Sequence, residues 1–451
     1  MKLAMHRNRL TAIAAMLCLS AAGHAAVTPQ EAAALKTTLT PLGAEKAGNQ
    51  DGSIPAWTGG IKPGTGVGPN GRRDDPFADD KKLYTITAKN VDEYSGKLTD
   101  GVKALIKKYP NSFRVDVYPT RRTAAAPGWM YENTLKNATQ GKMTDGQFPE
   151  KVFGGVPFPI PKTGAEVMWN SVLFWRGAAY HVDVQAFLGT SDGNIVMTVD
   201  AGNDLQFPYY DESYRDKFTG EWLLARVLNY GPPIRAGEAL LVRNQFDDAK
   251  SRGYVYVTGQ RRVRRLPNLC CDTPSPASAG VMTFDEIGVF TGSLERFNWK
   301  IVGKKEIIVP YNSNRILVPP KTSTVIQPNH LNPDYVRWEL HRVWVVEATL
   351  ASGKRHAAKR NLYYIDEDTW MPVLGDRFDA KNELWRTLFS LPLAAPDLPG
   401  AIQGPYGFYD LLGGTWFSSQ HMNETKVQYK FQKPKPESTF TPDALAGEGV
   451  R

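Results

Sequence analysis

Short apolar runs separated by polar turns fill the chain after about residue 180, and this pattern restricts the fold more than any other feature. The runs 181–188 and 194–199 flank Thr190-Ser191-Asp192-Gly193, in which the glycine supplies the positive φ of a hairpin turn. Further runs with strand character lie at 239–244, 253–265, 294–302, 306–310, 335–350, 359–365, 371–378 and 384–389. Strands joined by short turns predict an antiparallel meander rather than a parallel sheet alternating with helices.

Helical patterns are fewer. Apolar residues recur at helical spacing between Val91 and Tyr109, where Pro110 ends the run, and again over 164–175. A third helical pattern is predicted from 214 to 229, closed by a Gly-Pro-Pro sequence. The fold class predicted from these patterns is mainly β with some α. Thr28-Pro29-Gln30-Glu31 is typical of a helix start and predicts a short N-terminal helix.

The N-terminus has the three parts of a secretory signal. Residues 1–9 carry three basic side chains, 10–22 are mostly apolar, and small residues follow. The apolar run is shorter than the roughly 18 to 20 residues that cross a bilayer. We therefore expect cleavage between Ala25 and Ala26 and export to the periplasm, and Leu17 before Cys18 argues against a lipoprotein signal.

The next segment, 48–76, is dense in glycine, proline and aspartate, yet contains Ile54 and Trp57. We interpret it as an ordered strap lying over the body, because large apolar residues are uncommon in a free linker. The expected division is 1–25 signal peptide, 26–90 N-terminal helix and strap, 91–430 sheet domain with covering helices, and 431–451 C-terminal tail.

Charge is nearly balanced once the signal is removed. The count falls from 54 basic against 46 acidic residues to 51 against 46, which is too weak an excess to indicate a nucleic-acid partner. The sharpest local cluster is Arg261, Arg262, Arg264 and Arg265. Strand alternation would place Arg262 and Arg264 on one face and the other two opposite, so the cluster either solubilises a strand end or docks on an acidic partner.

The mature chain keeps two cysteines, Cys270 and Cys271, adjacent in sequence. They exclude a disulfide framework and a metal site of their own. A strained vicinal disulfide and two exposed thiols in a loop both remain open.

No motif predicts catalysis, a cofactor or a metal. The GxSxG string at 189–193 is followed by a strand where a nucleophile elbow needs a helix, and the GxGxxG string at 66–71 opens no helix. His181, His330, His341, His356 and His421 lie in no metal-binding spacing, so a metal site would need distant segments. Asp366-Glu367-Asp368 lacks the pattern of a calcium loop and is expected to be a solvated hairpin turn.

Bulky aromatic residues on predicted strands are the candidates for a ligand-binding wall. Trp299, Tyr335, Trp338 and Trp344 are the residues expected to line an apolar pocket, although a packed core accounts for each one equally simply.

Five segments together resemble a bacterial family of unknown function that is often labelled outer-membrane lipoprotein-sorting protein and is similar to the LolA/LolB lipoprotein carriers. They are GAEKAGNQDGSIPAWTGG at 43–60, DPFADDKKLYTITAKN at 75–90, KKYPNSFRVDVYPTRRTAAAP at 107–127, GGVPFPIPKTGAEVMWN at 154–170 and RNLYYIDEDTWMPVLGDRFDAKNELWR at 360–386. The resemblance implies a strongly curved antiparallel sheet, an incomplete barrel, closed by helices over an apolar cavity, with no catalytic residues.

This resemblance leads to two functional hypotheses. The first is a periplasmic carrier, not an enzyme, that binds a lipid, an acyl chain or another hydrophobic molecule and works with a membrane transporter. The alternative is a periplasmic adaptor that docks on an RND-type transporter or an outer-membrane protein. An open apolar cavity favours the carrier, and a filled core with an exposed patch favours the adaptor.

Overall fold

The computed structural model describes residues 27–64, 66–267 and 270–448. The expected signal peptide and its cleavage between Ala25 and Ala26 therefore lie outside the described residues. Within the described ranges, no helix has the length and apolar character needed to cross a bilayer.

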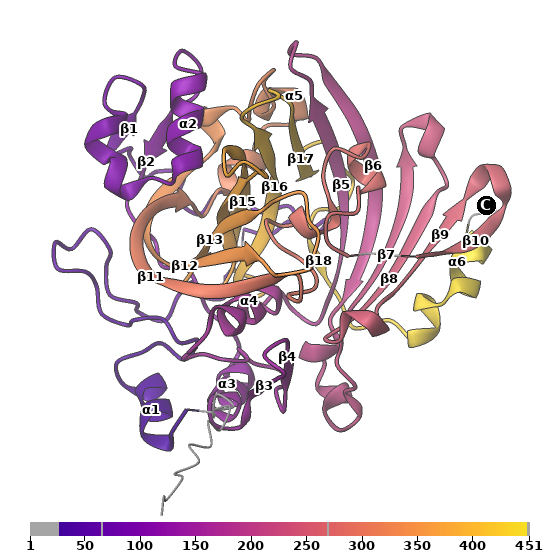
Figure 1. The fold of residues 1–451 in the computed structure, drawn as a ribbon, viewed down its shortest axis with the longest axis horizontal. Coiled ribbons are helices and arrows are strands. Elements are labelled where there is room, and N and C mark those ends of the chain that lie inside the picture. The colour runs from indigo at the N-terminus through magenta and orange to yellow at the C-terminus, as the bar shows by residue number, and fades with distance from the viewer. Residues whose placement is uncertain (1–26, 65, 268–269, 449–451) are drawn as a thin grey trace, which may run out of the picture.

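Most strands belong to one large sheet, which curves through the molecule without closing into a barrel (Figure 1). Its strands are β1 (Tyr84–Ile86), β2 (Val115–Val117), β5 (Ala179–Gly189), β6 (Ile195–Gln206), β7 (Glu221–Gly231), β8 (Ala239–Gln245), β9 (Arg252–Val257), β10 (Arg262–Leu266), β11 (Phe297–Pro310), β12 (Trp338–Leu350), β13 (Arg360–Asp366), β14 (Pro372–Phe378), β15 (Leu384–Ala395), β16 (Gly400–Asp410), β17 (Trp416–His421) and β18 (Lys430–Phe431). The predicted fold class, mainly β with a curved antiparallel sheet, is confirmed.

The spatial order of the strands is β1-β2-β12-β13-β14-β15-β16-β17-β5-β6-β7-β8-β9-β10, while β11 pairs with β12 and β18 with β5. Neighbours are antiparallel except at a single parallel contact, where Trp338 of β12 lies beside Val117 of β2. The hairpin predicted around residues 190–193 joins β5 to β6. A separate hairpin consists of β3 (Lys142–Thr144) and β4 (Phe148–Glu150).

The helices are short and lie around the sheet. They are α1 (Pro29–Ala33), α2 (Asp100–Lys108), α3 (Gly128–Gln140), α4 (Gly164–Val172), α5 (Thr322–Val325) and α6 (Pro442–Glu448). The predicted helix start at Thr28 is confirmed, because Thr28 and Glu31 form a reciprocal capping box that satisfies the first backbone donors. α2 and α4 fall within two of the helical patterns, and α3 is a helix that the sequence did not indicate.

The third predicted helix is wrong. Residues 212–217 form 3-10 turns, and Glu221–Gly231 is strand β7 at the centre of an antiparallel ladder. Leu224 is buried against the C-terminal region on one face of this strand, whereas Trp222 is buried, and Leu223 and Val227 are half-buried, against the main core. A strand with apolar residues on both faces reads as a continuous apolar run, which periodicity alone does not separate from a helix.

The strap is ordered, as its apolar residues indicated. Ile54 is 1% exposed and belongs to the main hydrophobic core, which extends along the chain from Leu42 to Tyr429. The indole nitrogen of Trp57 donates a hydrogen bond of 2.9 Å to the carbonyl oxygen of Ala124. The strap therefore packs as part of the body and supports the segment that leads into α3.

Candidate functional site

The end of the sheet formed by β7 to β10, which we call the wing, projects to one side of the molecule (Figure 1). One face of the wing is covered by the C-terminal helix α6. Leu224, Leu241 and Tyr256 of the wing form a small hydrophobic cluster with Phe440 and Leu445 of this C-terminal region. We call this the α6-side face. Its apolar side chains are buried by the chain's own residues.

The opposite face of the wing, the core-side face, is also apolar. Side chains alternate between faces along each strand, and the register places residues of successive strands beside one another on this face. One row across the sheet is Val182, Asn203, Val227, Leu240, Val255 and Arg264. The next row is Tyr180, Leu205, Ala225, Val242, Gly253 and Leu266. Both rows begin in the buried core at β5 and lead outward to the edge strand β10.

The apolar residues of the outer strands are less buried than those at β5. Val182 is fully buried, whereas Leu240, Val242, Val255, Val257 and Leu266 are only half-buried. Among the described residues, these last five side chains pack against none of the three hydrophobic clusters. The core-side face of the wing is thus an apolar surface that the described part of the chain leaves only partly covered, which marks it as a candidate binding surface.

The four predicted arginines lie at the outer edge of the wing and are solvent-exposed. Arg262 and Arg264 flank Val257 and Val255 on the core-side face, as alternation predicted. Arg265 is beside Tyr254 on the α6-side face, and Arg261 occupies the left-handed turn before β10 with φ of 48°. Within the described ranges none of the four is ion-paired. The cluster is therefore divided between two faces and a turn.

The four predicted aromatic residues do not converge on one pocket. Trp299 packs edge-to-face on Phe290, and Trp344 lies parallel to the ring of Trp370, further along β12. Tyr335 is in a 3-10 turn before β12 and is half-buried against the core. Each contributes to packing where it stands, and their role as a ligand wall is not supported by their positions.

Trp338 alone lines a cavity, which lies between α2 and the sheet beside Phe389 and Tyr409. Its volume is about 30 Å³, roughly the space of one water molecule. An acyl chain does not fit there, so this interior behaves as a packed core.

A larger groove of about 430 Å³ opens at the end of the wing where β7 begins and β8 ends. Phe153, Phe218 and Phe246 form its floor through edge-to-face contacts, and the Arg215 guanidinium lies 5.1 Å from the Phe153 ring centre. Sequence reasoning did not identify this groove. Its residues come from three distant segments, so no local pattern could have grouped them.

The prediction of a solvated turn at Asp366-Glu367-Asp368 is wrong, because all three residues are at most 3% exposed. Asp368 accepts a bidentate pair of hydrogen bonds from Arg122, at 2.9 and 2.6 Å. Glu367 lies 2.8 Å from the ammonium of Lys304. Buried carboxylates persist only with such partners. The turn is therefore an anchor inside the molecule.

Beside this anchor, His341, Asp366 and Asp368 place three potential metal-ligand atoms within 4.8 Å of one another. Each group already has a partner, however. Asp368 is held by Arg122, and Nε2 of His341 is 3.0 Å from Glu339. Burial raises the pKa of the Asp366 carboxyl. The arrangement fits a buried network of ions and a shared proton better than a metal centre.

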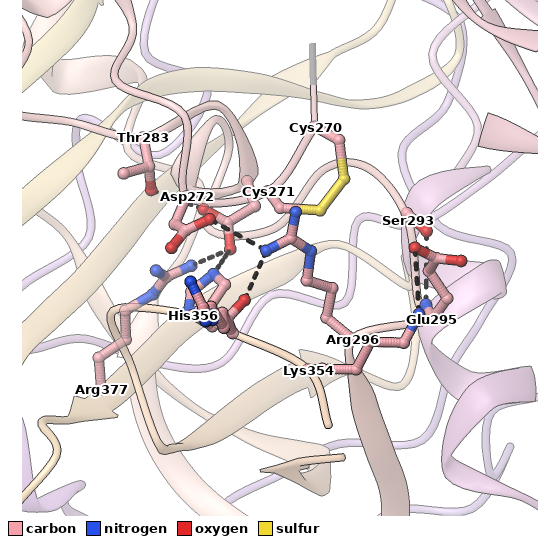
Figure 2. The surroundings of a disulfide bond; sticks show 12 residues. Cys270, Cys271, Asp272, Thr283, Ser293, Glu295, Arg296, Lys354, His356 and Arg377 are labelled. Carbon is pink, nitrogen blue, oxygen red and sulfur yellow. Dashed lines mark hydrogen bonds and ion pairs between the residues drawn. A yellow bond between two sulfur atoms is a disulfide. The ribbon is translucent and has the colours of Figure 1, made fainter. Parts of the chain in front are cut away.

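The sulfurs of Cys270 and Cys271 are bonded in the structure, and both residues are at most 7% exposed (Figure 2). The chain that follows is fixed to the sheet by ion pairs. Asp285 contacts His356 and Arg377 at 2.9 Å each, and its backbone nitrogen donates to the carbonyl oxygen of Cys271. Burial alone would raise the pKa of the Asp285 carboxyl, but Arg377 and His356 hold it well below its usual range.

His181 fixes the C-terminal tail to the sheet. Its two ring nitrogens lie 3.2 Å from Asp183 and 2.9 Å from Asp204, and Lys435 of the tail lies 2.7 Å from Asp204. Hydrogen bonds that the protonated ring donates to Asp183 and Asp204 raise the pKa of His181 to about 9. The sequence suggested a surface hydrogen bond to Asp183; the structure adds the second carboxylate and the tail.

This arrangement predicts a loss of stability in mild alkali. The folded pKa of His181 lies above its ordinary value near 6.5, so its contribution is complete below that pH and disappears as the pH rises through about 9. We expect the thermal midpoint of the wild type to fall between pH 7 and 9.5, and the fall to be smaller in His181→Asn. If the thermal midpoint, measured by circular dichroism, fell equally with pH in the two proteins, this assignment to His181 would be contradicted.

The geometry defines a protein built on an open, curved antiparallel sheet, with one apolar face of its wing only partly covered. The chain belongs to the family described as protein of unknown function, DUF1329, whose model matches residues 85–446. This confirms the family resemblance that the sequence segments carried.

Similar proteins are found among curated sequences and solved structures. An uncharacterized protein of Pseudomonas aeruginosa is 38% identical over 460 residues, covering 98% of each chain. A DUF1329 family protein from Desulfovibrio piger has a TM-score of 0.41 at 11% identity, covering 60% of this chain and 92% of its own. A putative outer membrane lipoprotein-sorting protein domain from Vibrio parahaemolyticus has a TM-score of 0.42 at 12% identity, with the same coverage.

Proposed function

We propose that this protein binds a hydrophobic molecule on the core-side face of the wing and carries it through the aqueous bacterial envelope. One observation carries the proposal: Leu240, Val242, Val255, Val257 and Leu266 form a contiguous apolar surface that is only half-buried. The apolar residues on the other face of the same strands are covered by α6. An apolar ligand would complete the missing cover on this face.

The energetics suit such a role. Burying about 400 Å² of apolar surface contributes about 10 kcal/mol at ~25 cal/mol per Å². A hydrogen-bonded sheet holds its side chains in place before binding, which limits the entropy lost when the ligand docks. Useful affinity therefore requires no covalent chemistry, which supports a binding protein rather than an enzyme.

The place of action follows from the N-terminal sequence. Residues 1–25 have the pattern of a cleaved signal peptide, which supports export to the periplasm. Between the two membranes of an envelope, a hydrophobic molecule must be shielded from water. We propose that a membrane transporter supplies or receives the molecule.

Copurified ligand and probe binding test the carrier. We expect organic extraction of the purified mature chain to release a hydrophobic molecule, and a fluorescent fatty-acid probe to bind. The variant Leu240→Thr with Val255→Thr places β-branched residues, which suit a strand, at both positions but makes the face polar, so probe affinity should fall at least tenfold.

The matched control is Val302→Thr with Leu412→Thr, which alters two exposed apolar residues outside the wing. Its affinity should equal that of the wild type. The carrier proposal fails when the wild type releases no hydrophobic molecule and binds no probe.

A second candidate function is an adaptor that docks on an RND-type transporter or an outer-membrane protein. The exposed arginines at the open edge of the sheet support it, because an edge strand with unpaired cations suits an acidic partner. Absence of probe binding, together with recovery of one envelope protein by photo-crosslinking from position 265, would favour the adaptor over the carrier.

A further inference from the structure

We infer that the ligand is a single-chain anionic amphiphile, whose acidic head group pairs with Arg262 and Arg264 while its apolar chain lies along the core-side face of the wing. This inference rests on the proposed function and adds the chemical class of the ligand. It follows from the way charge and apolar surface meet on this one face.

The two guanidinium groups belong to the same surface as the apolar row. Arg264 is the cross-strand neighbour of Val255, and Arg262 is the neighbour of Val257. Because Arg262 and Arg264 are two residues apart in β10, both side chains leave the same side of the strand about 7 Å apart. An acidic head group at the rim could contact both cations at once.

Within the described ranges neither Arg262 nor Arg264 has an ion-pair partner. The row that ends at Arg264 contains no acidic residue. Arg262 lies in the neighbouring row beside Val257, and Glu238, two residues before Leu240 in the chain, is already paired with Arg235 at 3.0 Å. Elsewhere on the wing the chain does pair its cations: Arg243 binds Glu221 and Glu437 at 2.7 Å. An anionic ligand would supply the missing counter-charge.

The dimensions fit a long acyl chain. Four strand spacings separate Asn203 from Arg264, which makes the row about 19 Å long at ~4.8 Å per spacing. The row runs from the exposed Arg264 through half-buried residues to the buried Val182 of β5, so a chain laid along it would leave its tail near the core and its head at the rim. This polarity matches an amphiphile and does not match a neutral hydrocarbon.

Charged residues on an edge strand also protect a sheet from aggregation. Protection from aggregation does not depend on which face of the strand carries the charge, whereas ligand binding does. Two variants that remove charges from different faces therefore separate the two roles. Arg262→Gln with Arg264→Gln removes two charges from the core-side face. Arg261→Gln with Arg265→Gln removes two charges from the turn and the α6-side face.

The experiment measures binding of a fluorescent long-chain fatty acid and of its methyl ester, which has the same chain without the charge. We expect the wild type to bind the acid at least tenfold more tightly than the ester. The Arg262/Arg264 variant should lose this preference and keep its affinity for the ester, while the Arg261/Arg265 variant should behave as the wild type.

Each other outcome is decisive. Equal binding of acid and ester by the wild type, or an unchanged preference in the Arg262/Arg264 variant, overturns the anionic head group but leaves the carrier. Equal loss of preference in both variants reduces the effect to overall charge and also overturns it. Failure of the wild type to bind either probe overturns the carrier itself.

Discussion

Replacing Arg122 by methionine should lower the free energy of unfolding by about 3–5 kcal/mol and loosen the strap. The side chain of Arg122 is 3% exposed and makes the bidentate pair with the equally buried Asp368. Its Nη2 also donates to the carbonyl oxygen of Glu45, just before the strap, at 2.6 Å, and its Nη1 donates to that of Pro55 in the strap at 3.3 Å. The guanidinium therefore joins the strap to the turn after β13. Methionine fills the volume but leaves a buried carboxylate without its cation. Urea unfolding measures the loss, and limited proteolysis within 43–60 reports the strap.

The neighbouring residue provides the control. Arg121 pairs with Asp80 at 2.6 Å, but its side chain is 46% exposed, so Arg121→Met should cost about 1 kcal/mol or less. In the double variant Arg122→Met with Asp368→Leu no unpaired charge remains, and part of the stability should return. Equal losses of unfolding free energy for Arg121→Met and Arg122→Met would contradict the claim that burial of the Arg122–Asp368 pair causes the larger loss.

Residues 366–368 also illustrate a limit of the sequence. Three consecutive acids between two predicted strands indicate an exposed hairpin turn, and the hairpin itself is present. What the sequence does not show is that Arg122 and Lys304, from distant segments, enclose the turn. Burial of a charge depends on partners that are remote in the chain, so local composition is a poor guide to it.

Elements with one clear period were predictable. The β5–β6 hairpin, the cap at Thr28 and the helix within 164–175 each follow from local chemistry, namely turn glycine, side-chain capping and helical spacing. β7 was not, because it is apolar on both faces and therefore has no period of two. α3 is only weakly amphipathic, and Asn133 and Asn137 are among its buried residues. Its sequence therefore lacks the apolar stripe from which a helix is predicted.

Only part of the candidate site could be predicted from the sequence. The sequence predicted β8 and the placement of Arg262 and Arg264 on one face, which follows from alternation. It predicted a helix where β7 lies and one continuous strand over 253–265, whereas β9 and β10 are two antiparallel strands joined by a turn. It did not distinguish the half-buried Val255 and Val257 from the fully buried Tyr256 between them. Both faces of β9 are apolar, but α6, more than 170 residues away in the chain, covers only the face that holds Tyr256. The emphasis on bulky tryptophans was misplaced for a related reason: large aromatics fill cores, while the partly uncovered surface consists of valine and leucine.

Disrupting a second buried ion-pair network, the one around Asp285, should destabilise the protein as strongly as loss of Arg122. Arg377 is 1% exposed and lies 2.9 Å from Asp285, while the neighbouring Glu286 is held by Arg386 at 2.9 Å. We expect Arg377→Met to lower the free energy of unfolding by about 3–5 kcal/mol, because Asp285 stays buried and loses the guanidinium that compensates its charge. Hydrogen exchange at the backbone amides of 284–287 should rise, since this pair fixes the segment after the disulfide.

The pH dependence of this loss separates electrostatics from packing. In the wild type the lowered pKa of Asp285 gives stability that is present above its ordinary value near 3.8 and is lost as the pH falls. Without Arg377, burial should raise that pKa, so acid would relieve the unpaired charge. The difference between variant and wild type should therefore shrink from pH 7 to pH 4. A difference independent of pH would indicate lost packing instead.

Arg243→Met, which removes the more exposed pairs with Glu221 and Glu437, should show a smaller loss of unfolding free energy at both pH values.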